Sequence, residues 1–158
     1  FRSLQISGEH ARRVKVRQRK NESSVTEAFN AAFVERSRNI YQRAIFATTN
    51  PEPLTSTTEP FYVFPLNGYR FMYCTEVNKT NTGFQNAIDT LMEQFGEDSE
   101  NEAVSVLKEL LRYSYVDSDL HEGITRGSEI IIYNTPSYVA VRCSSVEEYH
   151  DAIKLISS

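Results

Sequence analysis

Hydrophobic and polar residues follow two different periods along this chain, and each period predicts a different kind of element. Val14 and Val16 alternate with cationic residues, which is the two-residue period of a strand whose other face carries charge. Over 25–46 the apolar residues instead recur at intervals of three and four, the period of a helix. We therefore expect an edge strand or an extended arm near the N-terminus, followed by one long helix.

Two pairs of apolar segments further along the chain predict two β-hairpins. The segments 61–66 and 69–77 flank Asn67-Gly68, the preferred central pair of a tight hairpin turn. The segments 129–133 and 138–142 are joined across a short polar loop. In each pair we expect the two strands to hydrogen-bond to each other.

Pro65, beside the first turn, has no backbone N–H and so predicts an exposed strand edge there. Three further helices, 82–95, 99–115 and 145–156, are expected because each begins with a Ser or Thr three residues before Gln or Glu. The second of these is expected to direct the following residues toward the core: Ala103, Val106, Leu107, Leu110 and Leu111.

These elements predict a single α+β domain, 24–158, with a mostly antiparallel sheet built from the two hairpins and amphipathic helices packed on one face. A basic N-terminal arm, 1–23, precedes the domain, and a loop rich in proline and threonine, 50–60, interrupts it. With 158 residues and 40% hydrophobic content, the chain can bury one core of ordinary size. Its apolar runs are far shorter than the ~18 residues of a membrane span, so no membrane partner is expected.

The charge of the chain changes sign near residue 50. Residues 1–50 contain ten Lys and Arg against four Glu, a net charge of +6, whereas 51–158 contain seven basic and seventeen acidic residues, a net charge of −10. A basic segment on an acidic body indicates binding through charge, either to a polyanion or to the acidic surface of another copy. The cations expected to contact a partner are Arg12, Arg13, Lys15, Arg17, Arg19 and Lys20.

Two aromatic residues, Tyr69 and Phe71, complete the expected partner-binding set. The segment 68–73 partly resembles the aromatic strand on which RNA-recognition-motif domains stack bases. Arg70 stands where that motif has a small residue, and Cys74 where it has a further aromatic. Alternating aromatics are more typical of a core face, so contact with bases is the second interpretation of this segment.

No motif in the sequence identifies a reaction, a metal or a cofactor. His10, His121 and His150 are far apart, and the chain has neither a Gly-x-Ser-x-Gly elbow nor a phosphate-binding glycine loop. The acidic segment 117–123 has alternate carboxylates, but it lacks the glycine and the final glutamate of a calcium-binding loop and is interpreted as a solvated turn. We expect no catalytic residues, no metal and no cofactor.

The sequence therefore favours a non-enzymatic structural or assembly protein that forms homo-oligomers, or docks in a larger complex, through its basic arm and acidic body. A head-to-tail contact generates a ring or a filament, as components of phage tails and connectors do, so a virion component is one form of this hypothesis. The alternative is a nucleic-acid-binding protein whose basic arm contacts phosphates. No secretory signal is visible, and the expected location is the cytoplasm or a virion.

Overall fold

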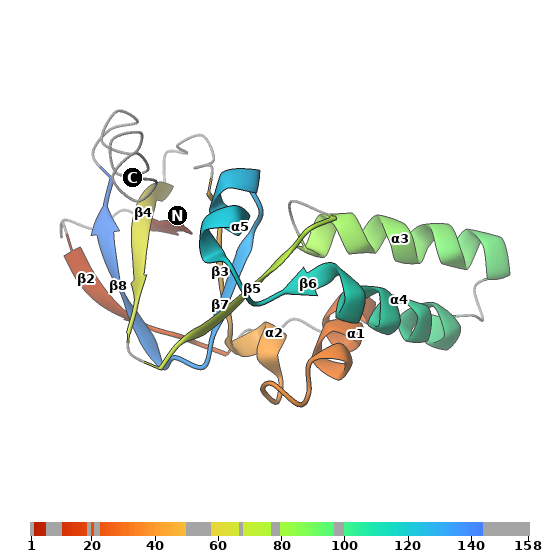
Figure 1. The fold of residues 1–158 in the computed structure, drawn as a ribbon. Coiled ribbons are helices and arrows are strands. Elements are labelled where there is room, and N and C mark those ends of the chain that lie inside the picture. The colour runs from red at the N-terminus through yellow and green to blue at the C-terminus, as the bar shows by residue number, and fades with distance from the viewer. Residues whose placement is uncertain are drawn as a thin grey trace.

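The computed structural model describes residues 2–5, 11–18, 20, 23–49, 58–66, 68–76, 80–96 and 100–143 (Figure 1). The helix predicted over 145–156 and most of the loop predicted over 50–60 lie outside these residues. The described residues form five helices and two antiparallel sheets, which confirms the α+β class.

Strands and helices alternate irregularly along the chain. The strands are β1 (Arg2–Gln5), β2 (Ala11–Lys15), β3 (Ile45–Ala47), β4 (Thr58–Pro65), β5 (Arg70–Cys74), β6 (Tyr115–Val116), β7 (Ile130–Tyr133) and β8 (Ser137–Arg142). The helices are α1 (Ser24–Ala32), α2 (Ile40–Arg43), α3 (Thr80–Phe95), α4 (Glu100–Ser114) and α5 (Leu120–Arg126).

The strands form two sheets of four. Sheet A has the order β1-β4-β8-β2, and sheet B has the order β3-β7-β5-β6. β2 lies at one edge of sheet A and pairs with β8 of the same chain. β1 pairs with β4 no further than Phe61, so residues 62–65 have a described strand neighbour on one side, β8. This exposed edge agrees with the expectation drawn from Pro65.

The predicted hairpins are wrong, although their strands are present. β4 pairs with β8 in sheet A, and β5 pairs with β7 in sheet B. Phe61 pairs with Arg142 in sheet A, and Tyr73 pairs with Ile130 in sheet B. The number of residues between these two pairs is the same on both segments, so the register continues unchanged from one sheet into the other. The two segments therefore form one long antiparallel ribbon that passes from sheet A into sheet B.

The ribbon changes sheet at a corner that contains Gly68 and Asn134. Both residues have left-handed backbone, with φ +86° at Gly68 and φ 60° at Asn134, and Asn134 Nδ2 donates to Gly68 O at 3.0 Å. Glycine adopts this conformation at no steric cost, and asparagine adopts it more readily than most residues. The glycine that predicts a local hairpin turn thus supplies a bend for strands that pair at long range.

The single long helix predicted over 25–46 is also wrong. The chain forms α1 and α2, separated by a turn in which Asn39 has φ 53°, and then enters β3. Asn30 of α1 holds α2 in place: its Oδ1 accepts from Tyr41 N at 2.9 Å, and its Nδ2 donates to Gln42 Oε1 at 2.8 Å. The break also lets β3 pair with β7, which a continued helix would prevent.

Helices α3 and α4 confirm two of the predicted helices, over 82–95 and 99–115. The acidic segment 117–123, interpreted from sequence as a turn, instead contains the start of α5. Asp119 caps this helix, because its Oδ1 accepts from Glu122 N at 3.1 Å, and Gly127 ends it with φ +78°.

Sheet B is covered on both faces, which gives the molecule three layers. Met72 and Ile131 on one face belong to a core shared with α1, α2, α3 and α4. Tyr73 and Ile130 on the other face pack in a second core with Phe61 of sheet A. Helices α1 to α4 therefore cover one face of sheet B, as predicted, whereas sheet A and α5 cover the opposite face. Burial from both sides explains the unbroken apolar sequence of β7.

Candidate functional site

The cations expected to bind a partner lie on two different faces of β2. Arg13 and Lys15 are exposed on the outward face, whereas Arg12 and Val14 are partly buried on the inward face. The guanidinium carbon of Arg12 lies 5.4 Å from the ring centre of Phe61. Strand alternation therefore separates Arg12 from the other expected binding residues.

The outward cationic surface continues past the end of β2. Val16 N donates to Pro136 O at 2.9 Å, which extends the pairing by one residue. Arg13 Nε donates to Ser137 Oγ at 3.0 Å and fixes this guanidinium beside β8. Arg19 lies outside the described residues. We call the exposed cations in this region the cationic edge: Arg13, Lys15, Arg17 and Lys20.

Two valines of β8 adjoin the cationic edge. Val139 is the cross-strand partner of Arg13, and Val141 is the partner of Ala11. Partners in an antiparallel pair project from the same face, so both valines share the outward face with Arg13, and both are partly exposed. This face of sheet A therefore offers a partner an apolar strip bordered by positive charge.

The opposite end of the molecule is acidic. α3 and α4 pack together as a helix pair that extends away from the sheets (Figure 1). Lys108 and Arg112 are the basic residues on these two helices, and Arg112 pairs with a helix neighbour, Glu109, at 3.1 Å. We call this surface the acidic helix pair; its exposed carboxylates are Asp89, Glu93, Glu100, Glu102 and Glu109.

An apolar stripe runs along α4 on the same helix pair. Val106 and Leu110 are each 46% exposed and Tyr113 is 85% exposed, so the expectation that Val106 and Leu110 face the core is wrong. Their spacing of four and three residues places them on neighbouring turns of one face. Leu107 and Leu111 fill the core instead. The acidic helix pair thus combines negative charge with unburied apolar surface, as the cationic edge combines positive charge with Val139 and Val141.

The two aromatic residues of the expected binding set lie in a different place. Tyr69 is 40% exposed and Phe71 is partly buried, and both line an apolar pocket with a volume of about 300 Å³. The other described walls come from β3, β7, the exposed edge of β4 over 62–65, and α5. The structure therefore does not join Tyr69 and Phe71 to the cationic edge in one surface.

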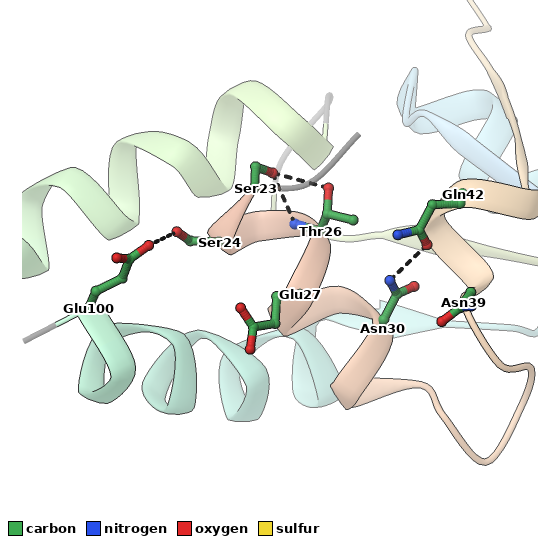
Figure 2. A pocket seen from close by; sticks show the side chains of 8 residues that line it. All are labelled: Ser23, Ser24, Thr26, Glu27, Asn30, Asn39, Gln42 and Glu100. Carbon is green, nitrogen blue, oxygen red and sulfur yellow. Dashed lines mark hydrogen bonds between the residues drawn. The ribbon is translucent and has the colours of Figure 1, made fainter. Parts of the chain in front are cut away.

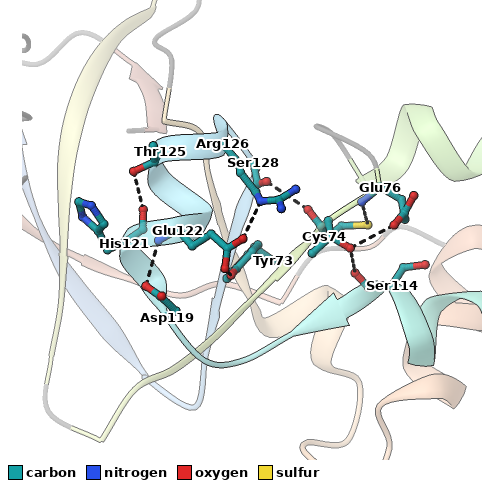
Figure 3. Close-up of polar contacts among 11 residues, drawn as sticks. Tyr73, Cys74, Glu76, Ser114, Asp119, His121, Glu122, Thr125, Arg126 and Ser128 are labelled. Carbon is teal, nitrogen blue, oxygen red and sulfur yellow. Dashed lines mark hydrogen bonds and ion pairs between the residues drawn. The ribbon is translucent and has the colours of Figure 1, made fainter.

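Helix α5 is held against sheet B by a close contact and by hydrogen bonds, and Figure 3 shows the hydrogen bonds. A Cβ atom on Gly123 would lie 2.7 Å from Cδ1 of Tyr73, so only glycine allows this approach without a shift. Tyr73 Oη donates to Glu122 Oε2 at 3.5 Å, and Arg126 Nε donates to Glu122 Oε1 at 2.9 Å. Burial, and then the negative charge of Glu122, raise the pKa of the Tyr73 hydroxyl. These contacts fix the wall of the pocket that α5 provides.

The sequence did not indicate this pocket, because it did not indicate helix α5, which forms one of the pocket walls. One local signal was present: Leu120 and Ile124, which line the pocket, are four residues apart and follow a capping Asp119. Four-residue spacing after a cap indicates a helix with one apolar face. The short length of α5 makes this signal weak.

The acidic residues near α5 serve structural contacts. Asp117 Oδ2 lies 2.9 Å from Nη1 of Arg36, and Asp119 caps the helix. His121 is exposed on α5 (Figure 3). Across the described ranges of the chain, no group of three or more His, Cys, Asp or Glu side chains is arranged to hold a metal ion.

A second pocket, of about 580 Å³, is polar and lies between α1, α2 and α4 (Figure 2). Ser24 Oγ donates to Glu100 Oε1 across it, and Asn30 Nδ2 donates to Gln42 Oε1 at 2.8 Å. Ser23 Oγ accepts from Thr26 N at 3.2 Å as the N-cap of α1. These groups link the three helices to one another, which indicates a structural role.

Comparison with protein-family models, with curated proteins and with solved structures finds no match to this chain. Among the helices of the described segments, none combines the length and the apolar character that crossing a membrane requires.

Proposed function

We propose that this chain is a non-enzymatic assembly protein whose copies join head to tail, the cationic edge of one against the acidic helix pair of the next. The observation that carries the proposal is that β2, with Arg13 and Lys15, lies at the other end of the molecule from the acidic helix pair on α3 and α4 (Figure 1). Unlike surfaces on identical subunits form heterologous contacts, and repetition of such a contact produces a ring or a filament. A phage tail or connector component, or a subunit of another large complex, uses contacts of this kind.

Charge and apolar area have different parts in this contact. An exposed ion pair contributes about 0–1 kcal/mol, so charge mainly sets the orientation and the rate of encounter. Affinity requires apolar surface that the contact removes from water. Val106, Leu110 and Tyr113 supply it on one side, and Val139 and Val141 on the other.

A charge-swap experiment tests the proposal. Variant one carries Arg13→Glu, Lys15→Glu and Arg17→Glu, and variant two carries Glu102→Lys and Glu109→Lys. Light-scattering mass is measured for the wild type at low and high salt, for each variant alone, and for an equimolar mixture.

The wild type is expected to form multimers at low salt that dissociate at high salt, because salt screens exposed charges. Each variant alone is expected to be a folded monomer, since like charges then meet at the contact. The mixture is expected to assemble again, because each altered surface finds an opposite one on the other variant. A wild type that stays monomeric at every salt concentration, or a variant one that keeps the wild-type mass, would overturn the proposal.

Nucleic-acid binding is the second candidate, favoured by the row of exposed cations on and beyond β2. A mixed-sequence oligonucleotide added to the same light-scattering measurement tests it. A monomer that gains mass only with the oligonucleotide would place this function first, and each phosphate contact would add about 0.7–0.9 to the log–log salt slope. Tyr69 and Phe71 are not expected to take part, because they line the separate apolar pocket.

A further inference from the structure

The apolar pocket has the dimensions of a ligand site. Its volume of about 300 Å³ is at the lower end of the ~300–1,000 Å³ typical of small-molecule pockets. An occupant must therefore be small.

The walls of the pocket are uncharged and rich in aromatic rings. Tyr69 and Phe71 supply the rings, and aliphatic residues of α5, β3, β4 and β7 supply most of the remaining surface. Tyr62 and Phe64 line the pocket at the edge of β4, but they pair with Val141 and Val139 and so project from the outward face of sheet A. None of the described lining residues carries a charge, and the polar side chains among them are hydroxyls. Water in such a space has few hydrogen-bond partners, so an apolar occupant replaces it favourably.

The walls are held apart by the fold. β5 and β7 are fixed by their ladder, and the corner at Gly68 and Asn134 directs β4 away from them into sheet A. α5 is packed on sheet B, because Gly123 rests on the ring of Tyr73 and Tyr73 Oη donates to Glu122 of the helix. The space is therefore a consequence of strand topology, and collapse of single side chains would not close it.

We propose that this pocket binds a small, uncharged, largely apolar molecule with an aromatic ring system, and that it hydrogen-bonds no more than one or two polar groups of that ligand. Aromatic rings stack or meet edge to face with a planar ligand, which favours this class. Thr48 and Thr49, which follow β3, line the pocket, and we expect their hydroxyls to contact a polar substituent. An ionised ligand is disfavoured, because burying a charge without a partner of opposite sign is costly.

Two fluorescent probes with the same ring system test the charge preference. N-phenyl-1-naphthylamine is neutral, and 8-anilino-1-naphthalenesulfonate is its sulfonated analogue. Titration of the full chain with each probe is expected to show saturable binding of the neutral probe at one site, with at least tenfold weaker binding of the sulfonate.

Variants locate the probe in the pocket. Ile124→Phe adds volume at a half-buried position of α5 that lines the pocket and is expected to weaken the neutral probe at least tenfold. Val34→Phe adds the same ring in the turn after α1, at a position that is 55% exposed and does not line the pocket, and it is expected to leave binding unchanged. Leu120→Phe, one turn before Ile124, provides a second filling variant if the first does not fold.

Methyl NMR spectra of the wild type give an independent readout, in which the probe is expected to shift Ile124, Ile130 and Ile132. The proposal is overturned if the neutral probe does not saturate, if the sulfonate binds as tightly, or if Val34→Phe weakens binding as much as Ile124→Phe. These results are independent of the assembly test, because neither the pocket variants nor the control alters a residue of the cationic edge or of the acidic helix pair.

Discussion

Substitution of Gly123 by Ala tests the contact that places α5 on sheet B. The new Cβ would lie 2.7 Å from Cδ1, 2.8 Å from Cγ and 3.0 Å from Cε1 of Tyr73, whereas carbon atoms prefer about 3.5–4.0 Å. Tyr73 is 1% exposed, so its ring has little room to retreat. Either α5 or the ring must shift, as in overpacking of a core, which costs about 1–3 kcal/mol.

Helix propensity acts in the opposite direction. Alanine stabilises a helix interior by about 1 kcal/mol relative to glycine. The overpacking cost exceeds this gain over most of its range, so we expect the free energy of unfolding to fall by about 1 kcal/mol. Urea unfolding followed by circular dichroism measures the change. Binding of N-phenyl-1-naphthylamine should also weaken, because the shift moves Ile124, a wall of the apolar pocket.

Thr125→Ala is the matched control, since Thr125 is exposed on the same helix. It is expected to change the free energy of unfolding by no more than about 0.5 kcal/mol, because it alters no packed contact. A Gly123→Ala variant that gains about 1 kcal/mol, the full helix-propensity effect, would refute the close contact between α5 and Tyr73.

Two further predictions concern the helical core. Burial raises the pKa of Tyr115 well above its ordinary value, so between about pH 10 and this raised pKa the unfolded chain loses a proton that the folded chain keeps, and stability falls as the pH rises. Tyr115→Phe loses the 2.6 Å hydrogen bond with Thr80 Oγ1, so its free energy of unfolding should be about 0.5–1.5 kcal/mol below that of the wild type at pH 7. Near pH 11 the difference should be smaller, because the wild type has lost stability there. Urea unfolding that shows the same difference at both pH values would contradict this. Leu107→Ala, at a fully buried position, should lower the free energy of unfolding by about 2–5 kcal/mol. Val106→Ala, at a position 46% exposed, should lower it much less. Equal losses in urea unfolding would show that the buried and exposed faces of α4 are wrongly assigned.

Local patterns predicted the elements whose stability depends on neighbours in sequence. The capping residues and apolar periodicity of α3 and α4 gave spans within two residues of those observed. The strands β4, β5, β7 and β8 were also predicted, but their partners were not. Gly68 favours positive φ in a hairpin turn and in the observed corner alike, so the sequence near it cannot distinguish local from long-range pairing.

The break between α1 and α2 depends on contacts that periodicity does not contain. Asn30 positions α2 through side-chain hydrogen bonds to Tyr41 N and Gln42. The next strand, β3, pairs with β7, which is far away in the sequence. Tertiary contacts of this kind routinely override helix propensity.

For the candidate site, strand alternation was the informative signal. It placed Arg13 and Lys15 on an outward face, and the same alternation directs Arg12 inward over Phe61. The positions of Tyr69 and Phe71 could not be inferred in this way. Their pocket exists because β4 and β5 belong to different sheets and because α5 covers the space, and both conditions are long-range properties of the fold.

The arrangement of charge gives a further reason to favour assembly. A soluble domain that uses charge only to stay dispersed does best with both signs interspersed over its surface. Here Arg13 and Lys15 lie on one edge of sheet A, whereas Glu102 and Glu109 lie on α4 at the far end, beyond sheet B. In the proposed assembly, such separation is expected to attract other copies at low salt, and the partly exposed apolar residues beside each charge cluster are expected to strengthen the attraction. Within the described chain Leu107 and Leu111, on the neighbouring face of α4, fill the core, which leaves the apolar stripe exposed; in the proposed assembly the next copy would cover it.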